Sequence, residues 1–280
     1  MKKISRRSFL AAAAVSAAAL ALTACGGSAS TASSAVASSV AASSEAASTS
    51  AAAAELTTVE AGKLTMATNA TFPPYEMTTD AGTIEGIDVD TAQAIAEKLG
   101  LELQIDDMDF DAALLSVQQG KADIAMAGIT VTDERMAVMS FSDSYATGIQ
   151  SIIVPEGSDI ASPDDLAGKK IGTQRGTTGY IYCSDDFGED SVVAYDSGLT
   201  AVQALNNGQV DAVVIDNAPA TEYVAANPGL KVLDTSYAEE DYAIGMAKGS
   251  ALEDAVNKAL EELKADGTLQ AIVDKYINAN

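Results

Sequence analysis

Residues 114–123 read LLSVQQGKAD and residues 202–211 read VQALNNGQVD, and this internal repeat indicates how the chain is organised. Each copy has a helix-like run, a glycine, two further residues, an aspartate and then an apolar strand-like run. Gly120 of the first copy corresponds to Gly208 of the second. A helix, a glycine and a strand in succession are common in α/β proteins, so one such match can arise by chance. Here it divides the folded part into two similar halves, which favours two lobes facing a cleft over one long sheet.

Strand-like and helix-like runs alternate from Lys63 onward, which is typical of an α/β domain with parallel strands. Two extended apolar runs, 149–154 and 242–246, would carry the chain from the first lobe to the second and back. Two such crossovers form a hinge. We expect strands at 64–68, 101–105, 124–127 and 170–173, and helices at 90–99, 111–119, 251–265 and 269–277.

The composition excludes several classes of function. The 280 residues include 40 acidic and 16 basic side chains, giving a net charge of −24, with no histidine and no tryptophan. Nucleic acid is not expected as a partner, because phosphate binding needs a basic face. Without histidine the chain lacks the most frequent general base and the most frequent metal ligand.

The first 24 residues have the features of an export signal. A basic start is followed by an Ala-rich apolar run, Ser8 to Leu22, too short for a confident transmembrane helix. It ends in Leu22-Thr23-Ala24-Cys25, which resembles the lipobox of bacterial lipoprotein signals. That resemblance implies cleavage before Cys25 and lipidation of its thiol. The alternative is an ordinary signal peptide in which the cysteine occurs by chance. Because Arg6-Arg7 also resembles a twin-arginine signal, both the general and the twin-arginine export routes stay open.

Residues 28–54 are nearly all Ala, Ser and Thr, and they lack the large apolar side chains that offset the entropy cost of ordering. We therefore expect a flexible tether that spans roughly 30 Å as a random coil. The predicted organisation is a signal peptide at 1–24, the lipidated cysteine and tether at 25–60, lobe 1 at 61–148 and 242–280, and lobe 2 at 149–241.

The octet GITVTDER at residues 128–135 is the segment most informative about function. Thr132 is a typical helix N-cap, and the acids after it suit a first helical turn. Arg135 lies in that same turn, where a cation opposes the helix dipole. This placement is explained if an anion docks there, because backbone N–H groups and a guanidinium together bind a carboxylate or phosphate. A surface ion pair with Asp133, Glu134 or a remote acid is an equal alternative.

Other candidate residues follow predicted strands, and in open α/β sheets ligands bind beyond the carboxyl ends of strands. Phe72 lies in the loop NATFPPY at 69–75, Phe110 lies between a strand and a helix, and Asp216 ends the apolar run 212–215. Each has an ordinary explanation: the rings could be core residues, and Asp216 could cap the next helix. Together with Arg135 they describe a site for a zwitterion that carries a side chain.

The second predicted lobe contains a further candidate anion-binding loop, QRGTTG at residues 174–179. This loop follows a strand and precedes a helix, so backbone N–H groups at the helix start could bind a carboxylate. The phosphate-binding pattern G-x-x-x-x-G-K-[ST] is absent, so this is not a nucleotide loop.

Five motifs occur in an order that resembles the family 3 extracellular solute-binding proteins, the polar amino-acid receptors of ABC importers. They are TNATFPPYE, GIDVDTAQAIAEKLG, FSDSYATG, GKKIGTQRGTTG and DAVVID. The resemblance covers about residues 61–278. It implies an α/β fold of two hinged lobes, the type II periplasmic-binding-protein architecture.

The resemblance also implies roles for the zwitterion site. Arg135 would hold the ligand's α-carboxylate with the backbone N–H groups of Thr130 and Thr178. Asp216 would accept the α-ammonium group, with the Gly128 carbonyl and the Thr130 hydroxyl.

Four further positions would contact the ligand side chain. Phe72 and Phe110 would sandwich it, whereas Asn69 and Gln174 occupy positions that vary with specificity in the family. Asn69 is neutral where relatives that take cationic side chains often carry an acid, which argues against a purely basic ligand.

The resulting prediction is a monomeric, lipid-anchored receptor that captures a polar amino acid and delivers it to a membrane permease, without catalysis, cofactor or metal. Glutamine, a basic amino acid and cystine are the candidate ligands. Two alternatives stay open. An enzyme of the same fold would need an acid or base in the cleft, for which Glu76, Asp107 and Asp109 are the candidates. A sensory module would present the ligand to a membrane receptor instead of an importer.

Overall fold

The computed structural model describes residues 56–277, and within them the internal repeat has a clear structural meaning. Gly120 and Gly208 both have left-handed backbones, with φ of 65° and 67°, and each ends a helix. The aspartate three residues later accepts a hydrogen bond from the backbone of the neighbouring strand region. Asp123 accepts from the N–H of Thr65, and Asp211 accepts from the N–H of Lys170. The repeat therefore builds the same helix-to-strand connection once in each lobe. The predicted signal peptide, Cys25, tether residues 25–55 and residues 278–280 lie outside the described part.

The first lobe is built on a five-stranded sheet with the order β5-β1-β6-β14-β7. Strand β1 pairs in parallel with β5 and β6, and β14 pairs antiparallel with β6 and β7. A small antiparallel sheet, β2-β3-β4, follows β1. The strands are β1 (Lys63–Thr68), β2 (Thr71–Phe72), β3 (Glu76–Thr78), β4 (Ile84–Glu85), β5 (Glu102–Asp107), β6 (Ile124–Ala125), β7 (Met139–Phe141) and β14 (Gly245–Ala247).

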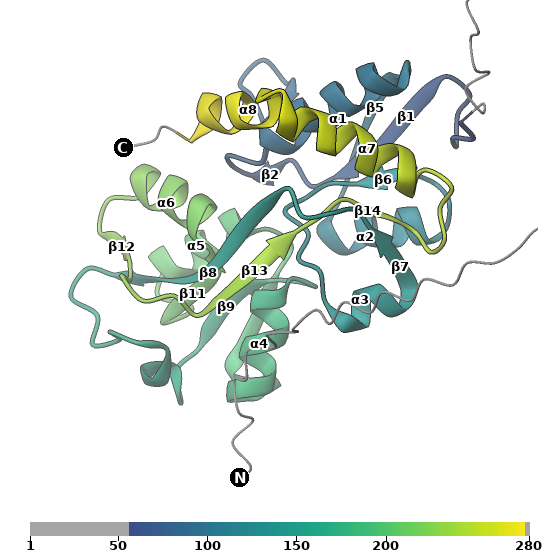
Figure 1. Ribbon diagram of the computed structural model, residues 1–280. Coiled ribbons are helices and arrows are strands. Elements are labelled where there is room, and N and C mark those ends of the chain that lie inside the picture. Colours follow the sequence, from purple (N-terminus) through teal and green to yellow (C-terminus); the bar gives the residue numbers. More distant parts are fainter. Residues whose placement is uncertain (1–55, 278–280) are drawn as a thin grey trace, which may run out of the picture. The chain divides into compact units, whose positions relative to one another are not determined.

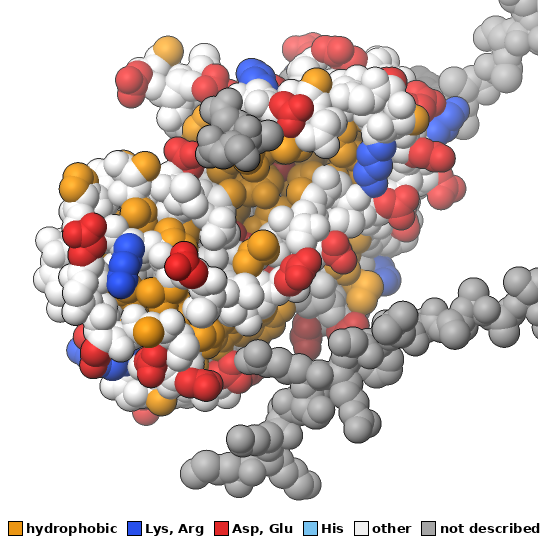
Figure 2. Space-filling model, turned by 60° about the vertical axis from the view of Figure 1, so that its left-hand side comes forward, with side chains coloured by type: hydrophobic (Ala, Val, Ile, Leu, Met, Phe, Trp, Pro, Cys, Tyr) orange, Lys and Arg blue, Asp and Glu red, His pale blue; other side chains and the backbone are white. Residues whose placement is uncertain are grey.

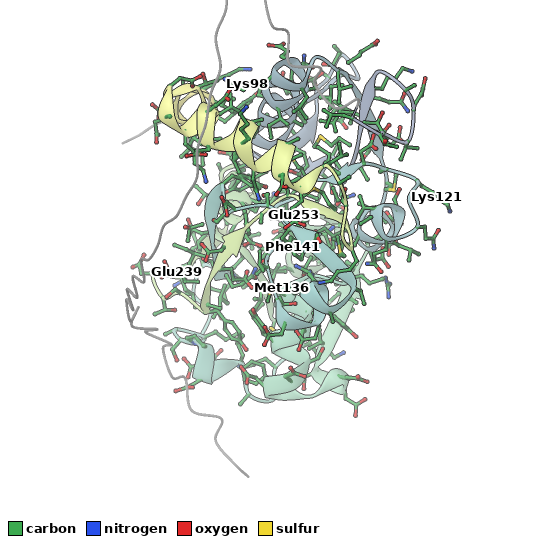
Figure 3. All side chains as sticks on the ribbon, turned by 45° about the vertical axis from the view of Figure 1, so that its right-hand side comes forward. Lys98, Lys121, Met136, Phe141, Glu239 and Glu253 are labelled. Atoms are coloured by element: carbon green, nitrogen blue, oxygen red, sulfur yellow. The ribbon has the colours of Figure 1, made fainter. Side chains whose placement is uncertain are left out.

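Helices α1, α2 and α7 of this lobe bury apolar side chains, whereas α3 buries only Arg135. Figure 1 shows α1, α7 and α8 side by side. In α7 the buried Val256, Ala259, Leu260 and Leu263 recur at helical spacing. Lys98 of α1 lies beside α7 and contacts Glu262 and Asp266 (Figure 3). Such exposed ion pairs contribute at most about 1 kcal/mol, so burial holds these helices together. They are α1 (Ile87–Leu99), α2 (Phe110–Gln118), α3 (Asp133–Val138), α7 (Glu253–Ala265) and α8 (Thr268–Tyr276).

The second lobe has a sheet of the order β10-β9-β11-β8-β12, with β13 also paired to β8. Strand β9 is parallel to β10 and β11, as the repeat predicts, whereas β8 is antiparallel to its partners. The elements are β8 (Ala146–Pro155), β9 (Ile171–Gln174), α4 (Thr178–Phe187), β10 (Val192–Tyr195), α5 (Gly198–Asn206), β11 (Ala212–Asp216), α6 (Asn217–Ala226), β12 (Leu230–Val232) and β13 (Ala238–Tyr242), with 3₁₀ turns at Pro163–Leu166 and Glu189–Ser191.

The two crossovers between the lobes are the antiparallel strands β8 and β13, which run side by side from Ala146 opposite Tyr242 to Gln150 opposite Ala238 (Figure 1). After β13 the chain enters β14 of the first sheet. The fold is thus the predicted α/β architecture of two lobes joined by two crossovers. The exact lobe boundaries at 148/149 and 241/242 stay predictions, because the paired strands extend beyond both points.

Several predicted element bounds were wrong by a few residues. Helix α1 begins at Ile87 rather than at residue 90, because Gly86, with φ of 143°, ends the preceding hairpin and places Asp88 and Asp90 in the first turn. Strand β6 ends at Ala125 rather than at residue 127. The chain then approaches Gly128, whose φ of 56° directs it into the next loop.

Candidate functional site

All nine residues predicted to bind a ligand line one cleft between the lobes. The cleft contains about 310 Å³ of atom-free space, part of it open to solvent. Three residues that were not predicted to bind a ligand, Glu76, Ala127 and Thr177, complete the wall. The predicted residues in the wall are Asn69, Phe72, Phe110, Gly128, Thr130, Arg135, Gln174, Thr178 and Asp216.

Arg135 is held in the cleft with only 8% of its surface exposed. Its backbone N–H donates to the Thr132 hydroxyl at 3.2 Å, so Thr132 is the predicted helix cap. Its guanidinium donates to the Thr130 carbonyl at 2.7 Å and to the Gly176 carbonyl at 3.1 Å, and it lies 5.4 Å from the centre of the Phe110 ring. Among residues 56–277 no ion pair involves Arg135, so the alternative of a surface ion pair does not hold there.

Burial lowers the pKa of Arg135 below its ordinary value, and the nearby Glu240 and Asp216 oppose this shift. The group nevertheless stays charged, because an arginine guanidinium does not lose its proton in proteins. Two of its five N–H groups are used in the hydrogen bonds above. The remaining N–H groups can receive the two oxygens of a carboxylate.

Two backbone N–H groups that were predicted to assist Arg135 belong to the same cleft wall. Thr130 forms an antiparallel bridge with Tyr242 in which the residues on either side make the hydrogen bonds, so its own N–H and C=O point away from that strand. Thr178 is the first residue of α4, and a helix leaves its first N–H groups without an internal acceptor. The two threonine hydroxyls lie 3.5 Å apart across the cleft.

Asp216 ends β11 with a carboxyl group that is bonded to both crossover strands. It accepts from Gln150 Nε2 of β8 at 2.8 Å and from the Tyr242 hydroxyl of β13. Although Asp216 occupies the N-cap position of α6, its side chain makes no capping hydrogen bond, so the alternative of a helix cap is wrong. Burial raises the pKa of Asp216 to about 7.

Glu240 is a second buried acid of this network, and the sequence analysis did not identify it. Side chains alternate along a strand, so Glu239 is exposed on the outer face of β13 (Figure 3), whereas Glu240 and Tyr242 point inward. Glu240 accepts from Gln150 Nε2 and from the Thr178 hydroxyl, both at 3.0 Å. The period-two alternation of residues 238–242 was the signal that could have identified it.

Phe72 and Phe110 are both 6% exposed and belong to separate apolar clusters. They therefore serve as core residues and as cleft walls at once. The Phe72 ring also restricts Gly128: a Cβ atom added at Gly128 would lie 2.8 Å from its Cε1 atom. Glycine is thus required there both by the positive φ and by the aromatic wall.

Asn69 and Gln174 meet across the cleft, where Gln174 Nε2 donates to Asn69 Oδ1 at 2.8 Å. Asn69 also donates to the Met108 carbonyl at 2.9 Å. A second contact between the lobes joins the Tyr223 hydroxyl of α6 to the Thr71 carbonyl at 2.5 Å. With the bond from Arg135 to the Gly176 carbonyl, these contacts hold the lobes together around a narrow cleft.

Of the acids considered for catalysis, Glu76 alone lines the cleft. Asp107 accepts from the N–H of Ala70 at 2.8 Å, and Asp109 precedes α2 without a capping bond. Within residues 56–277, no group of three or more Cys, Asp or Glu side chains is arranged to hold a metal. Cys183 is buried there as a free thiol.

A second hollow lies on the crossover side, where hydrophobic side chains line its wall (Figure 2). Pro74 and Tyr276 of the first lobe, Thr221 of α6, and Ile149 and Tyr242 of the crossovers contribute to it. Asp216 lines both this hollow and the cleft, so it lies in the wall between them.

The fold and the cleft are those of a two-lobed solute-binding protein. Residues 64–279 match the family described as bacterial extracellular solute-binding proteins, family 3, and the chain belongs to this family. The proteins of this family bind solutes for transporters and are not enzymes. No helix of the described residues combines the length and apolar character that a membrane span needs.

Relatives with stated ligands include a probable histidine-binding protein of Neisseria gonorrhoeae, 34% identical over 219 residues, covering 75% of this chain and 81% of that protein. The L-cystine-binding protein TcyJ of Escherichia coli K12 is 32% identical over 226 residues, with coverages of 79% and 85%. Among solved structures, the arginine-, lysine-, histidine-binding protein ArtJ of Geobacillus stearothermophilus aligns with a TM-score of 0.75 and 35% identity, over 78% of this chain and 96% of that one.

Proposed function

We propose that the protein captures a polar amino acid in the cleft between its lobes and delivers it to the membrane permease of an ABC importer. The observation that carries this proposal is the pair of opposite charges on the two lobes. Arg135 on α3 keeps guanidinium N–H groups for a carboxylate, while Asp216 at the end of β11 offers a carboxyl group for an ammonium. The common part of every α-amino acid carries these two charges.

The groups around the cleft favour a ligand side chain that donates hydrogen bonds. Gln174 uses its Nε2 in bonds to Asn69 and to the Asp196 carbonyl, which leaves its Oε1 as an acceptor. Glu240 adds a carboxylate behind Thr178. Glutamine and the basic amino acids present N–H donors, and the named relatives bind histidine, cystine, arginine and lysine. The substrate class is therefore an amino acid with a polar, donating side chain.

A thermal-shift panel of the twenty amino acids and cystine tests this proposal on a chain that begins at residue 26. A ligand at 100 times its Kd adds about 2.7 kcal/mol of stability. For a protein of this size, 1 kcal/mol raises the Tm by about 2–4 °C. We expect a rise of about 5–10 °C with one or a few polar amino acids. No rise with any of the 21 compounds would refute amino-acid capture.

We propose further that Cys25 carries the lipid anchor and that the protein acts as a monomer on the outer side of the cell membrane. The Leu-Thr-Ala-Cys ending and the Ala/Ser-rich tether support this proposal. One acyl chain gives marginal membrane binding, whereas two hold a protein stably. Cys25→Ala should move the protein from the membrane to the soluble fraction. If the variant stays with the membrane and has an unmodified N-terminus, the anchor is not at Cys25.

Ligand capture is proposed to close the lobes by rotation about β8 and β13. Arg135 and Asp216 belong to different lobes, so a ligand that binds both adds a bond across the cleft. Small-angle scattering should show a smaller radius of gyration with ligand than without it. Arg135→Ala should not contract at the same ligand concentration. An unchanged profile at saturation would indicate a rigid, preformed cleft.

A further inference from the structure

Two fully buried carboxyl groups at the cleft wall have no direct role in the proposed zwitterion site. Glu76 begins β3 and Asp88 lies in the first turn of α1, and both side chains are 0% exposed. Glu76 also lines the cleft itself. Buried acids are costly unless they are paired, so their partners decide what they do.

Asp88 holds the loop that carries Gly128. Its Oδ2 atom accepts from the Gly128 N–H at 3.0 Å and from the Tyr145 hydroxyl at 2.8 Å. Gly128 has a left-handed backbone, with φ of 56°, and its carbonyl is the proposed second acceptor of the ligand ammonium. Asp88 therefore fixes the orientation of a peptide group in the cleft wall.

The two acids start from neighbouring backbone positions, because the Asp88 N–H donates to the carbonyl of Tyr75, the residue before Glu76, at 2.9 Å. No N–H or O–H group of the described residues donates to either oxygen of Glu76 or to Oδ1 of Asp88. The Glu76 and Asp88 carboxyl groups are within hydrogen-bonding reach of each other. Ionised carboxylates only accept hydrogen bonds, so this contact is satisfied only when one of the two carries a proton.

The surroundings of Glu76 favour that proton. Burial, above all, raises the pKa of Glu76 well above its ordinary value, and the Asp88 charge adds to the shift; burial also raises the pKa of Asp88, to about 6. Arg135, the cation of the cleft wall, acts on Glu240 and Asp216 instead. The titratable groups that face the pair from the elements packed around it are Asp107, Asp216, Tyr75, Tyr145 and Tyr223.

We propose that Glu76 and Asp88 share one proton, and that this protonated pair is the positioning element that holds Gly128 in its ligand-binding orientation. The ligand role of Gly128 rests on the proposed function, whereas the shared proton does not. Loss of the proton would leave two adjacent buried anions, which repel each other and withdraw Asp88 from the Gly128 N–H. Ligand affinity and stability should therefore both fall when the pair ionises.

Unfolding without ligand tests the shared proton. The folded pKa of Glu76 is raised above its unfolded value, so the stability it contributes is complete below the unfolded pKa and is lost as the pH rises through the folded pKa. In that window one proton is released on unfolding, and the unfolding constant rises up to tenfold per pH unit. Glu76→Gln keeps the shape and a donor but cannot ionise. Denaturation from pH 4 to 10 should show a flatter alkaline decline than in the wild type. Glu97→Gln, on the exposed side of α1, should leave the decline unchanged.

Calorimetry with the best amino acid from the panel, in two buffers of different ionisation enthalpy, tests the link to binding. At alkaline pH the wild type should take up more protons on binding than Glu76→Gln does, because only the wild type can restore the proton of the pair, whereas uptake by the ligand's own amino group is common to both proteins. If no amino acid binds, the proposed function fails. The unfolding data would still show whether Glu76 and Asp88 share a proton.

A direct readout covers the case in which Glu76→Gln does not fold. Infrared spectra of the wild type at pH 9, where Asp216 is ionised, should contain the C=O band of a buried, protonated carboxyl group. Asp88→Asn, whose amide can donate to Glu76 and accept from Gly128, should shift the position of that band, because the group bonded to the Glu76 carboxyl has changed. Identical pH profiles for the wild type and Glu76→Gln, or no such band in the wild type, would overturn the proposal.

Discussion

Asp216→Asn should weaken ligand binding and, at alkaline pH, stabilise the free protein. The substitution keeps the shape of the side chain but removes the charge that faces the ligand ammonium and one of the two acceptor oxygens to which Gln150 and Tyr242 donate. Truncating one partner of a buried charge pair costs about 2–5 kcal/mol, which is roughly 30- to 5,000-fold in Kd. An analogue of the ligand without the amino group should lose far less.

The stability effect has the opposite sign and follows from the raised pKa. Burial raises the pKa of Asp216 from 3.8 to about 7. The contribution of Asp216 to the free energy of unfolding is therefore complete below its unfolded pKa and is lost as the pH rises through about 7. The difference of roughly three pKa units corresponds to on the order of 4 kcal/mol, because one unit is about 1.4 kcal/mol. Asparagine has no such loss, so the variant should gain stability relative to the wild type between pH 4 and pH 8.

Urea denaturation at pH 4 and pH 8, without ligand, measures this gain, and calorimetry with the amino acid and its deaminated analogue measures the binding loss. The loss of binding free energy caused by Asp216→Asn for the amino acid, minus the loss for the deaminated analogue, isolates the contact between Asp216 and the ammonium group. Equal losses for the two ligands would show that Asp216 acts only on structure. A difference in stability between the variant and the wild type that is the same at pH 4 and pH 8 would show that the carboxyl group is not a buried charge.

Three further substitutions test other parts of the cleft. Arg135→Ala should weaken the best ligand by about 2–5 kcal/mol while leaving the fold intact. Calorimetry with less than a threefold loss of affinity would remove Arg135 from the site. Gly128→Ala should destabilise the protein by about 1–3 kcal/mol, since its Cβ would lie 2.8 Å from the Phe72 ring; an unchanged urea midpoint would contradict this. Gln150→Leu removes the donor shared by two buried carboxyl groups and should cost about 1–3 kcal/mol. Its loss of stability, measured in urea, should be greater at pH 8 than at pH 5, where Asp216 is protonated.

The fold was predictable because its signals are local. Each copy of the repeat, around Gly120 and Gly208, consists of a helix end followed by an aspartate that bonds to the neighbouring strand. Each copy is encoded within ten residues. The unusual position of Arg135 in a first helical turn is also visible in the sequence, and the cap at Thr132 fixes it. The rule that ligands bind beyond the carboxyl ends of strands predicts one cleft for Phe72, Phe110, Arg135 and Asp216, whereas the other five residues were assigned through the family resemblance.

The residues that were missed act through contacts distant in the sequence. Gln150 and Glu240 are 90 residues apart and meet because β8 and β13 pair. Neither residue follows a strand of the kind that suggests a site, and both are inside strands that read as crossovers. The proton between Glu76 and Asp88 was equally hidden, because it depends on the burial of two acids on different elements.

The two charged groups of the cleft differ in how they are held, and this difference connects the proposed capture to the proposed rotation about the crossover strands. Arg135 is fixed by carbonyl groups of the loops on either side of the cleft. Asp216 is bonded instead to Gln150 and Tyr242, one on each crossover strand. A ligand ammonium bonded to Asp216, as proposed, would share the carboxylate with these two donors, because a carboxylate has about four acceptor positions. The proposed recognition would thus act on a group bonded directly to the strands about which the lobes are proposed to turn.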